Sequence, residues 1–551
     1  MAILSGVLQV LPFPIAGPVP VWRTAFCWIA LVPLLAALSG SDVRGGPLRI
    51  GHGAALGYCS GIVWYLGNCY WIYPTMHLYG AIPKPLSAGI LLLFCLYLGL
   101  YHALFGALVV AFRRCNLRYQ AALLLAPFAW VAVELARARI TSFPWDQLGI
   151  TQVDNPLLTH LAPFTGAYGL SFIVAAVNVL WLAAGRPRQK GFPWPGIAIA
   201  SLAVALLSIP LKDIHKPAHE DFSATATLVQ DNLEVGAENR GPQLTKGEML
   251  TVFAKLSEYP GNYYCDGLTE SSSARCYSHS AGNPSARLPA RASSPLQDAT
   301  DLIVWPEAPT PFEDSDPEFR AAMSALARAE HAPIIVGNIG IDADRNVTRG
   351  YDLFNSADFV RPDGVFAGRY DKMHLVPFGE YVPYKKLFFF AGNLLADVGE
   401  FNFGSTRSVF KTGGHAYGTF ICYESIFADE VRQFEDLGAD ALVNISDDGW
   451  YGDTSAAWEH LNMVRMRAIE NHRWVLRATN TGITASIDPY GRVVASAPRH
   501  IRTSLRVGFG YEHDITFYAA HGDLFAYLCS LVTALGLGFS LARISAPRRA
   551  A

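Results

Sequence analysis

Three residues whose side chains together could perform acyl transfer occur in this sequence, each where a predicted strand ends. Glu307 closes the run DLIVWPE, Lys372 follows the second limb of a predicted hairpin, and Cys422 lies in GTFICYE. Catalytic groups of α/β folds collect at the carboxyl ends of strands. A cysteine thiolate attacks carbonyl carbon, a carboxylate can carry the thiol proton, and an ammonium stabilises an oxyanion. The set therefore predicts an acyl-transfer site that works through a thioester.

Each of these residues also has an ordinary structural explanation. Free cysteine is among the most buried residue types, so Cys422 alone could be a core thiol. Glu307 after Trp-Pro could cap a helix, and Lys372 could be a surface charge. Taken one at a time, these residues leave the structural explanations open. A predicted helix over 425–437 would add its N-terminal dipole to the stabilisation of the Cys422 thiolate.

The region from about 215 to 515 has the pattern of an α/β fold, in which strands alternate with helices. Hairpin turns such as that at Pro362, Asp363 and Gly364 indicate sheets that are mixed rather than purely parallel. Predicted strands and hairpins lie at 224–232, 301–307, 333–341, 351–375, 418–424, 441–446, 474–480 and 484–496, and a long helix is predicted over 456–472.

Hydropathy divides the chain into membrane and soluble parts. Of its 551 residues, 51% are hydrophobic and only 16% are charged, against about 25% charged in soluble proteins. A helix that crosses a bilayer needs about 20 mostly apolar residues. The first candidate contains LPFPIAGPVP and is expected to be broken or re-entrant. Candidate spans lie near 5–20, 22–40, 52–74, 86–112, 120–137, 163–185, 193–211 and 520–542.

Positive charge predicts the orientation of these spans, because short cytoplasmic loops are enriched in Lys and Arg. Basic residues follow every even-numbered span, at Arg44, Arg49, Arg113, Arg114, Arg118, Arg186, Arg188, Lys190, Arg543, Arg548 and Arg549. Fewer basic residues lie at the ends predicted to face away from the cytoplasm, namely Arg23, Lys84, Arg137 and Arg139. Both termini are therefore predicted to be cytoplasmic. We expect a bundle of about seven spans over 1–211, an extracytoplasmic domain over 212–517 and a membrane helix with a basic tail in 518–551.

Long motifs in chain order carry a resemblance to a known family. They are VWPEAPTP, YDKMHLVPFGEYVP, ICYESIF, NISDDGWYGDTSAAWEHLNMVRMRAIE and RATNTGITASIDPYG, with FPWDQLG on the membrane side. The chain resembles the nitrilase, or carbon-nitrogen hydrolase, superfamily, and within it the membrane-anchored apolipoprotein N-acyltransferases. This resemblance implies a multi-span helical bundle joined to an extracytoplasmic nitrilase-like domain, an α-β-β-α sandwich.

The resemblance also implies roles for single residues. Glu307 would be the general base, Lys372 the oxyanion stabiliser and Cys422 the nucleophile. Supporting roles are implied for Glu380, Tyr423 and Glu424. The alternative for the first of these is a structural hydrogen bond, and for the other two it is capping of the helix that follows.

The family that the chain resembles takes an acyl chain from a phospholipid onto its cysteine. It then passes the chain to the α-amino group of the S-diacylglyceryl cysteine that begins an apolipoprotein. The implied setting is a bacterial inner membrane, with the catalytic domain on the periplasmic side. No cofactor is implied, and the protein is expected to be a monomer. A membrane-anchored amidohydrolase and a catalytically silent lipoprotein-binding scaffold are the alternatives.

Aromatic residues in three loops are candidates for substrate contacts. We predict such contacts for Trp450, His77 and Trp145, with packing of turns and helix ends as the alternative. The segment KKLFFFAGNLL (385–395) is predicted to be an interfacial lid, with a buried helix as the alternative. Two departures from the family pattern concern the acyl acceptor: QDNLEVGAENRG is not followed by a Lys-Trp pair, and the Ser-rich loop 261–298 is long.

Cys265 and Cys276 lie in this Ser-rich loop, on the side predicted to be extracytoplasmic. Such compartments permit disulfides, so we predict that the two cysteines pair. The cysteines in and near the predicted spans are expected to be packing residues. No His/Cys spacing indicates a metal site, and no basic stripe indicates nucleic acid binding.

Overall fold

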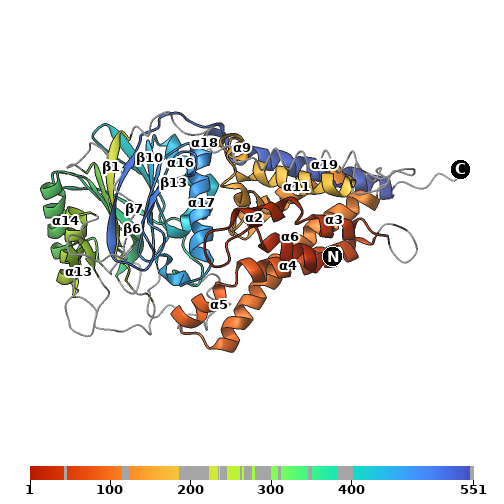
Figure 1. The fold of residues 1–551 in the computed structure, drawn as a ribbon, viewed down its shortest axis with the longest axis horizontal. Coiled ribbons are helices and arrows are strands. Elements are labelled where there is room, and N and C mark those ends of the chain that lie inside the picture. The colour runs from red at the N-terminus through yellow and green to blue at the C-terminus, as the bar shows by residue number, and fades with distance from the viewer. Residues whose placement is uncertain are drawn as a thin grey trace.

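The structure, a computed structural model, consists of a layered α/β part and a bundle of helices that extends from one face of it (Figure 1). The predicted span 193–211, the predicted lid 385–395 and most of the loop 261–298 lie outside the described residues. The residues that the structure describes are 1–41, 46, 48–114, 123–184, 222–233, 235, 245–260, 263–265, 276–278, 300–307, 312–344, 350–381 and 401–545.

Two six-stranded sheets form the α/β part, in the orders β14-β1-β4-β5-β6-β7 and β13-β12-β11-β10-β9-β8. Parallel pairs lie in the middle of each sheet and antiparallel pairs outside them, which confirms the predicted mixed sheets. The strands are β1 (Ala224–Gln230), β4 (Leu302–Val304), β5 (Ile334–Ala343), β6 (Tyr351–Val360), β7 (Phe366–Asp371), β8 (Val409–Thr412), β9 (His415–Ile421), β10 (Ala441–Ser446), β11 (Val475–Thr479), β12 (Ala485–Ile487), β13 (Val493–Ser496) and β14 (Thr503–Phe509).

The two sheets pack face to face and are covered by helices on their outer faces. Leu228 and Phe359 of the first sheet share one buried cluster with Phe420 and Val443 of the second. The helices α13 (Lys246–Glu258) and α14 (Pro317–Glu330) cover the first sheet, and α17 (Ala456–Asn471) lies between the second sheet and the bundle (Figure 1). The described elements therefore have the predicted α-β-β-α layering.

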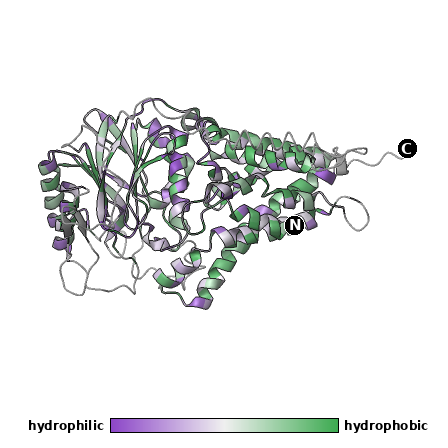
Figure 2. Ribbon diagram, in the orientation of Figure 1, coloured by the Kyte–Doolittle hydropathy of each residue, from purple (hydrophilic) through white to green (hydrophobic). Residues whose placement is uncertain are grey.

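Within the described residues, three helices of the bundle are long and apolar enough to cross a membrane: Lys84–Arg114, Ala167–Ala184 and Leu524–Ala542. Figure 2 shows the hydrophobic colour concentrated along the bundle helices. The longer helices of the bundle are α1 (Ala2–Val10), α3 (Val32–Leu38), α4 (Ile50–Asn68), α6 (Lys84–Arg114), α8 (Ala126–Ile140), α11 (Ala167–Ala184) and α19 (Leu524–Ser545). The shorter helices of the chain are α2 (Val21–Thr24), α5 (Ile72–Pro74), α9 (Pro156–Thr159), α10 (Ala162–Thr165), α15 (Ala428–Val431), α16 (Gln433–Asp436) and α18 (Phe517–His521).

Two predicted helices are divided in the structure. The first candidate span ends as a helix at Val10, just before the proline-rich run, since proline lacks the N–H that a helix interior needs. The segment predicted near 22–40 consists of α2, a 3₁₀ turn at Ala25–Trp28 and α3. The number of membrane spans therefore stays a prediction.

The predicted helix over 425–437 is confirmed only in part, because the helical residues begin at Ala428 and not at 425. A 3₁₀ turn occupies Cys422–Ile426, and two single-turn helices, α15 and α16, follow it. The break lies at Phe427, whose φ of −92° and ψ of 88° are not helical. The Phe427 ring packs against His374, with ring centroids 4.3 Å apart, and against Tyr423 at 5.4 Å. Packing of this ring accompanies the departure from helical geometry.

The bundle and the α/β part share one hydrophobic core. Tyr423, Tyr451 and Met463 of the α/β part belong to the same buried cluster as Trp71 and Trp145 of the bundle. Polar contacts cross the same boundary: the Ala167 N–H donates to Glu470 at 2.8 Å, and the Ser455 N–H donates to the Tyr70 hydroxyl at 3.0 Å. The two parts are therefore one packed unit where α17 meets the bundle.

Glycines allow α4 and α6 to approach closely. A Cβ atom added at Gly57 would lie 2.0 Å from the His102 carbonyl oxygen, and one added at Gly106 would lie 2.2 Å from the Gly53 carbonyl oxygen. Small residues at helix interfaces let membrane helices pack backbone to backbone. The opposite case is Gly51 of α4, where an added Cβ would meet no atom within 4 Å.

We predict that Gly57→Ala destabilises the protein, because the new methyl group would push the α4 and α6 backbones apart. The expected loss in free energy of unfolding is about 1–3 kcal/mol, as for other overpacked sites. The matched control is Gly51→Ala on the same helix, which should be neutral or stabilising by up to about 1 kcal/mol. Thermal unfolding of the detergent-solubilised proteins measures both changes. Equal effects of the two substitutions would contradict the prediction.

Candidate active site

The three residues predicted to be catalytic meet at strand ends of both sheets. Glu307 follows β4 by three residues and Lys372 directly follows β7, both in the first sheet. Cys422 directly follows β9 in the second sheet. Cys422 lies close enough to Glu307 and Lys372 for their charges to act on the pKa of its thiol, so the three residues share one site. The site therefore depends on the face-to-face packing of the two sheets.

A buried ammonium group organises the acidic side of this site. Lys372 Nζ lies 2.9 Å from Glu307 Oε1 and 2.9 Å from Glu380 Oε1. The Asn355 amide on β6 donates to the same two oxygens, at 2.7 Å each. The Lys372 side chain is only 1% exposed. Because burial of an unpaired charge is costly, the two carboxylates and the lysine stabilise one another.

Glu307 is held as a carboxylate by these partners. Its burial alone would raise the carboxyl pKa, but the Lys372 charge and the hydrogen bonds from Lys372, Asn355 and the Asp447 N–H bring the pKa below its usual value. The Asp447 N–H donates to the second oxygen, Oε2, at 2.8 Å. Glu307 can therefore accept a proton at neutral pH. Burial acts against the ammonium form of Lys372, but Glu307 and Glu380 raise its pKa well above the usual range.

Cys422 adopts a strained backbone conformation, with φ at +48°. Residues other than glycine rarely adopt positive φ, and such strain gathers at functional sites. Burial raises the pKa of the thiol well above its usual range, and the Glu307 charge raises it further while the Lys372 charge opposes both. The predicted helix dipole is replaced by a 3₁₀ turn of five residues. The resting cysteine is therefore a thiol, which needs a base to become the nucleophile.

The structure brings the predicted supporting residues to this site, in different ways. Glu380 lies within the ion cluster, and its second oxygen, Oε2, accepts the Val376 N–H at 2.7 Å. Tyr423 points toward the bundle and donates its hydroxyl hydrogen to the Ser142 carbonyl oxygen at 3.2 Å. The support that these residues would give to catalysis stays a prediction.

Glu424 binds four donors from two chain segments. Its Oε1 accepts the Tyr370 hydroxyl at 2.8 Å, the Met373 N–H at 2.6 Å and the His374 N–H at 3.2 Å. Its Oε2 accepts the Ile421 N–H at 2.7 Å. Burial raises the pKa of this carboxyl, and the backbone donors oppose that rise. Glu424 thereby ties the Lys372 segment to the Cys422 turn, which extends the predicted capping role.

The three aromatic candidates for substrate contact lie around the boundary with the bundle. Trp145 is 1% exposed, donates its indole N–H to Glu459 at 2.7 Å and stacks on His460 with ring centroids 6.0 Å apart. The Trp450 carbonyl accepts the Thr75 hydroxyl at 3.0 Å, so its turn rests on the loop that carries His77. Trp145 is thus a packing residue in this conformation. A substrate contact for any of the three stays a prediction.

Sequence reasoning missed several residues of this site. The predicted strand-end pattern could have found Asp447, because it directly follows β10. Asn355 gives only a weak signal, a buried polar residue in the middle of β6. His460 gives none, since a lone histidine on a helix is usually structural.

His460 belongs to a fully buried network that holds the Cys422 backbone. His460 Nε2 lies 3.0 Å from the Cys422 carbonyl oxygen, and Nδ1 lies 2.9 Å from Asp448 Oδ1. Arg477 in turn lies 2.6 Å from Asp448 Oδ2. Burial would raise the pKa of Asp448, but Arg477 and His460 lower it below the usual range. The network fixes the carbonyl of the strained residue from the side of α17.

Two further expectations concern cysteines and metals. Strands β2 (Tyr263–Cys265) and β3 (Cys276–Ser278) pair so that positions 265 and 276 are opposite each other, and the disulfide between Cys265 and Cys276 stays a prediction. Among the described residues, the ligand atoms of His472, Glu512 and Asp514 lie within 4.8 Å of one another at the surface. His472 is already bonded to Asp514 there, so this group carries no assignment.

We predict that Glu424→Gln lowers the free energy of unfolding by about 2 kcal/mol. The amide NH₂ of glutamine would face an N–H donor that now binds a carboxylate oxygen, and hydrogen bonds to charged groups contribute about 1.5–3 kcal/mol. Denaturant or thermal unfolding in detergent measures the loss. The exposed Glu258→Gln on α13 is the control and should change the free energy of unfolding by less than about 0.5 kcal/mol. An unchanged stability of Glu424→Gln would contradict the tie between the two segments.

Comparison with known proteins matches both parts of the chain. Residues 5–180 match the family model described as the apolipoprotein N-acyltransferase N-terminal domain, and 269–505 match the one described as carbon-nitrogen hydrolase. The α/β part is thus a carbon-nitrogen hydrolase domain. The solved structure of Saccharomyces cerevisiae Nit3, a member of branch 10 of the nitrilase superfamily, matches with a TM-score of 0.35 and 16% identity, covering 53% of this chain and 93% of that one.

Relatives match through both the bundle and the sandwich. An apolipoprotein N-acyltransferase from Geobacter metallireducens is 33% identical, covering 96% of this chain and 92% of its own. One from Ralstonia nicotianae is 32% identical, covering 90% of this chain and 85% of its own. One from Pasteurella multocida is 28% identical, covering 98% of this chain and 94% of its own. This chain therefore belongs to the apolipoprotein N-acyltransferase family.

Proposed function

We propose that this N-acyltransferase uses Cys422 to move an acyl chain from a membrane phospholipid to the N-terminal amine of a diacylated apolipoprotein. The observation that carries the proposal is the buried set of Glu307, Lys372 and Glu380 beside a strained cysteine. The names of the relatives supply the lipoprotein acceptor. The apolar helices, which would bring the site to a lipid surface, support a phospholipid as the donor.

In the first half-reaction, the Glu307 carboxylate takes the thiol proton while Sγ of Cys422 attacks the ester carbonyl carbon of the donor. The carbonyl oxygen becomes an oxyanion. Lysine has three N–H donors, and two of those on Lys372 bind Glu307 and Glu380, which leaves the third for this oxyanion. The ester C–O bond then breaks, Glu307 returns the proton to the leaving alkoxide, and a thioester remains with a lysophospholipid released.

In the second half-reaction, the α-amine of the acceptor attacks the thioester carbonyl carbon. Glu307 takes a proton from this nitrogen, and Lys372 again binds the oxyanion. When the C–S bond breaks, the proton returns to the sulfur of Cys422 and an amide is formed. Glu380 and Asn355 take no part in bond making. They hold Lys372 and Glu307 in place for both halves of the cycle.

We propose that the catalytic domain lies on the periplasmic side of the bacterial inner membrane and that both termini are cytoplasmic. Arg113 donates to the Leu38 and Gly40 carbonyls, and Arg114 to that of Leu48, so basic loops meet at one end of the bundle. The loops 75–79 and 142–152 contact the catalytic domain instead. The positive-inside rule assigns the basic end to the cytoplasm.

A mass measurement of the acyl-enzyme tests the proposal. Incubation of the protein with phospholipid alone should add the mass of one acyl chain to the peptide that contains Cys422. A diacylated lipopeptide added afterwards should remove this mass and become N-acylated. Cys422→Ala should carry no adduct and transfer nothing. Release of free fatty acid without N-acylation would favour the amidohydrolase alternative, and full function of Cys422→Ala in cells would favour the scaffold.

The pH dependence of acyl-enzyme formation tests the role of Glu307. Because the pKa of its carboxyl lies below the usual range in the folded protein, the rate should not change as the pH falls from neutrality toward that range. Asn355→Leu removes a donor to Glu307 and leaves the carboxylate buried, so its pKa should rise. The acid limb of the rate profile should then move to higher pH. The stability that Glu307 contributes is present above its unfolded pKa of about 4.3 and is lost as pH falls.

Asn338→Leu is the matched control for this profile. Asn338 is also buried on the first sheet, but its amide donates to Asp358 and not to Glu307. This variant should lose stability without a change in the position of the acid limb. A profile of Asn355→Leu that coincides with the wild-type profile would contradict the assignment of Glu307 as the base.

A further inference from the structure

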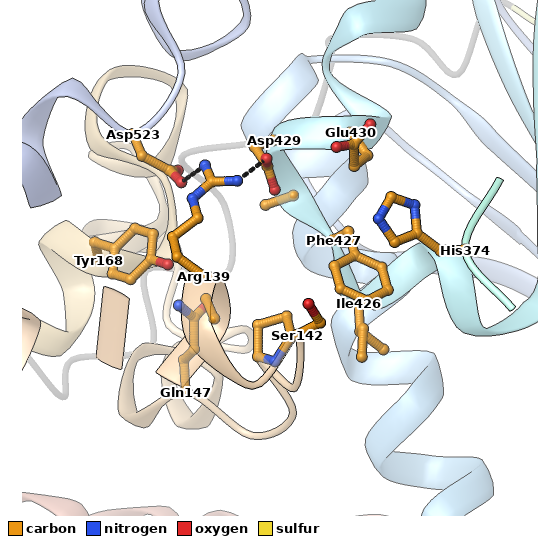
Figure 3. Close-up of a pocket in the computed structure, with 13 residues that line it drawn as sticks. Arg139, Ser142, Gln147, Tyr168, His374, Ile426, Phe427, Asp429, Glu430 and Asp523 are labelled. Atoms are coloured by element: carbon orange, nitrogen blue, oxygen red, sulfur yellow. Dashed lines mark hydrogen bonds and ion pairs between the residues drawn. The ribbon is translucent and has the colours of Figure 1, made fainter. Parts of the chain in front are cut away.

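A polar pocket opens where the bundle meets the catalytic domain, beside the turn that follows Cys422. The end of α8 and the loop after it form one wall, together with the start of α11 (Figure 3). The opposite wall comes from Phe427 and α15, and Asp523 closes one end just before α19. Neither the proposed chemistry nor the packing of the sheets uses this pocket.

Two polar side chains in this pocket have no hydrogen-bond partner among the described residues. Gln147 is 4% exposed and Tyr168 is 3% exposed. In Figure 3 the polar ends of both point into the pocket. Within the described residues, neither the Gln147 amide nor the Tyr168 hydroxyl makes a side-chain hydrogen bond. Buried polar groups are nearly always hydrogen-bonded, so these two donors indicate a ligand with acceptor atoms.

Charges of both signs surround these donors. Arg139 forms ion pairs with Asp429 and with Asp523, the latter at 2.6 Å, and its side chain is 38% exposed. Glu430 lies beside Asp429 on α15 and is paired with Arg407. Guanidinium groups have five N–H donors, so Arg139 can bind a further anion. Three carboxylates line the pocket against one guanidinium, which disfavours a ligand of net negative charge and favours one that carries its own cation.

Apolar side chains are exposed on the same elements. Ile140 at the end of α8 is 72% exposed, and Leu528, Leu531 and Leu535 on α19 are 52%, 54% and 64% exposed. Only 22% of the most apolar stretch of α19 is buried. Exposed apolar surface of this length faces lipid in a membrane helix. The pocket therefore has polar groups of both charges directly beside a lipid-facing strip, which fits an amphiphile.

We propose that this pocket binds the head group of a zwitterionic phospholipid with a primary ammonium, as a lipid site distinct from Cys422. The phosphate accepts hydrogen bonds from Gln147, Tyr168 and Arg139, and the ammonium donates to Asp429 and Glu430. The acyl chains lie along the exposed face of α19. This assignment concerns reversible binding and is independent of the transfer chemistry.

A hydrogen bond between Tyr423 and Ser142 lies between this pocket and Cys422, and a bound head group can stabilise it. The Tyr423 hydroxyl donates to the carbonyl oxygen of Ser142, a residue that lines the pocket. Ile426 and Phe427, at the end of the Cys422 turn, line it as well. A bound head group thus fills the space behind this turn. It stabilises the turn without access to the sulfur.

Native mass spectrometry in detergent tests the proposal by counting bound lipids. The protein carries Cys422→Ala, so that no acyl group is transferred, and the probe is phosphatidylethanolamine. Removal of two hydrogen bonds in Gln147→Leu/Tyr168→Phe should weaken one lipid site about tenfold and lower the number of retained lipids by one. Equal retention by the two proteins would overturn the site. A missing acyl adduct on wild-type Cys422 would sink the proposed function but leave this count intact.

Three comparisons fix the chemistry of the occupant. Phosphatidylglycerol with the same acyl chains should be retained less well, and retention equal to that of phosphatidylethanolamine would overturn the zwitterionic assignment. Free phosphoethanolamine should not displace the lipid at millimolar concentration, and full displacement would overturn the need for a lipid. Tyr417→Phe, which breaks the 2.6 Å bond to Tyr511 in the catalytic domain, should lower thermal stability but keep the lipid. The double variant should be as stable as its parent, since neither group bonds to protein.

Discussion

The catalytic arrangement depends on one buried ammonium group. Lys372 directly follows β7. Its charge is compensated by Glu307, which follows β4, and by Glu380, which lies eight residues further along the chain from the lysine. Without the lysine, two buried carboxylates would face each other across Asn355 and would repel or take up a proton. Without the carboxylates, the ammonium would be buried alone. The ion cluster is therefore a condition of folding at this place as well as of the proposed chemistry.

The cysteine is held from two other directions. Glu424 draws the Cys422 turn toward the Lys372 segment, and His460 binds the Cys422 carbonyl oxygen from α17. A residue with φ at +48° costs of the order of 1–3 kcal/mol and persists only where its surroundings enforce the conformation. Charged and backbone hydrogen bonds on both sides provide that enforcement. The strained geometry is thus held by two networks, one that joins the Cys422 turn to the Lys372 segment and one that comes from α17.

Most residues of the candidate active site could be predicted because they follow strands. Glu307, Lys372 and Cys422 could be found because each follows a recognisable β pattern, and the same rule extends to Asp447. Asn355 and His460 could not be found, since their roles depend on pairing between β6 and β7 and on the packing of α17 against the Cys422 turn. Hydropathy predicted α6, α11 and α19, but it could not predict the division of 22–40 or of 425–437, where tertiary packing overrides the local pattern.

The shared core joins the catalytic domain to the bundle over a packed surface. α17 presents Glu459 and Glu470 to the bundle and His460 to the cysteine, all on one helix of 16 residues. Trp145 of the bundle stacks on the same His460 that binds the Cys422 carbonyl oxygen. The position of the cysteine is therefore set partly by contacts from the bundle. A packed helix changes in discrete steps rather than continuously, so a lipid-dependent shift at Trp145 or Ser142 would reach Cys422 through only one or two contacts.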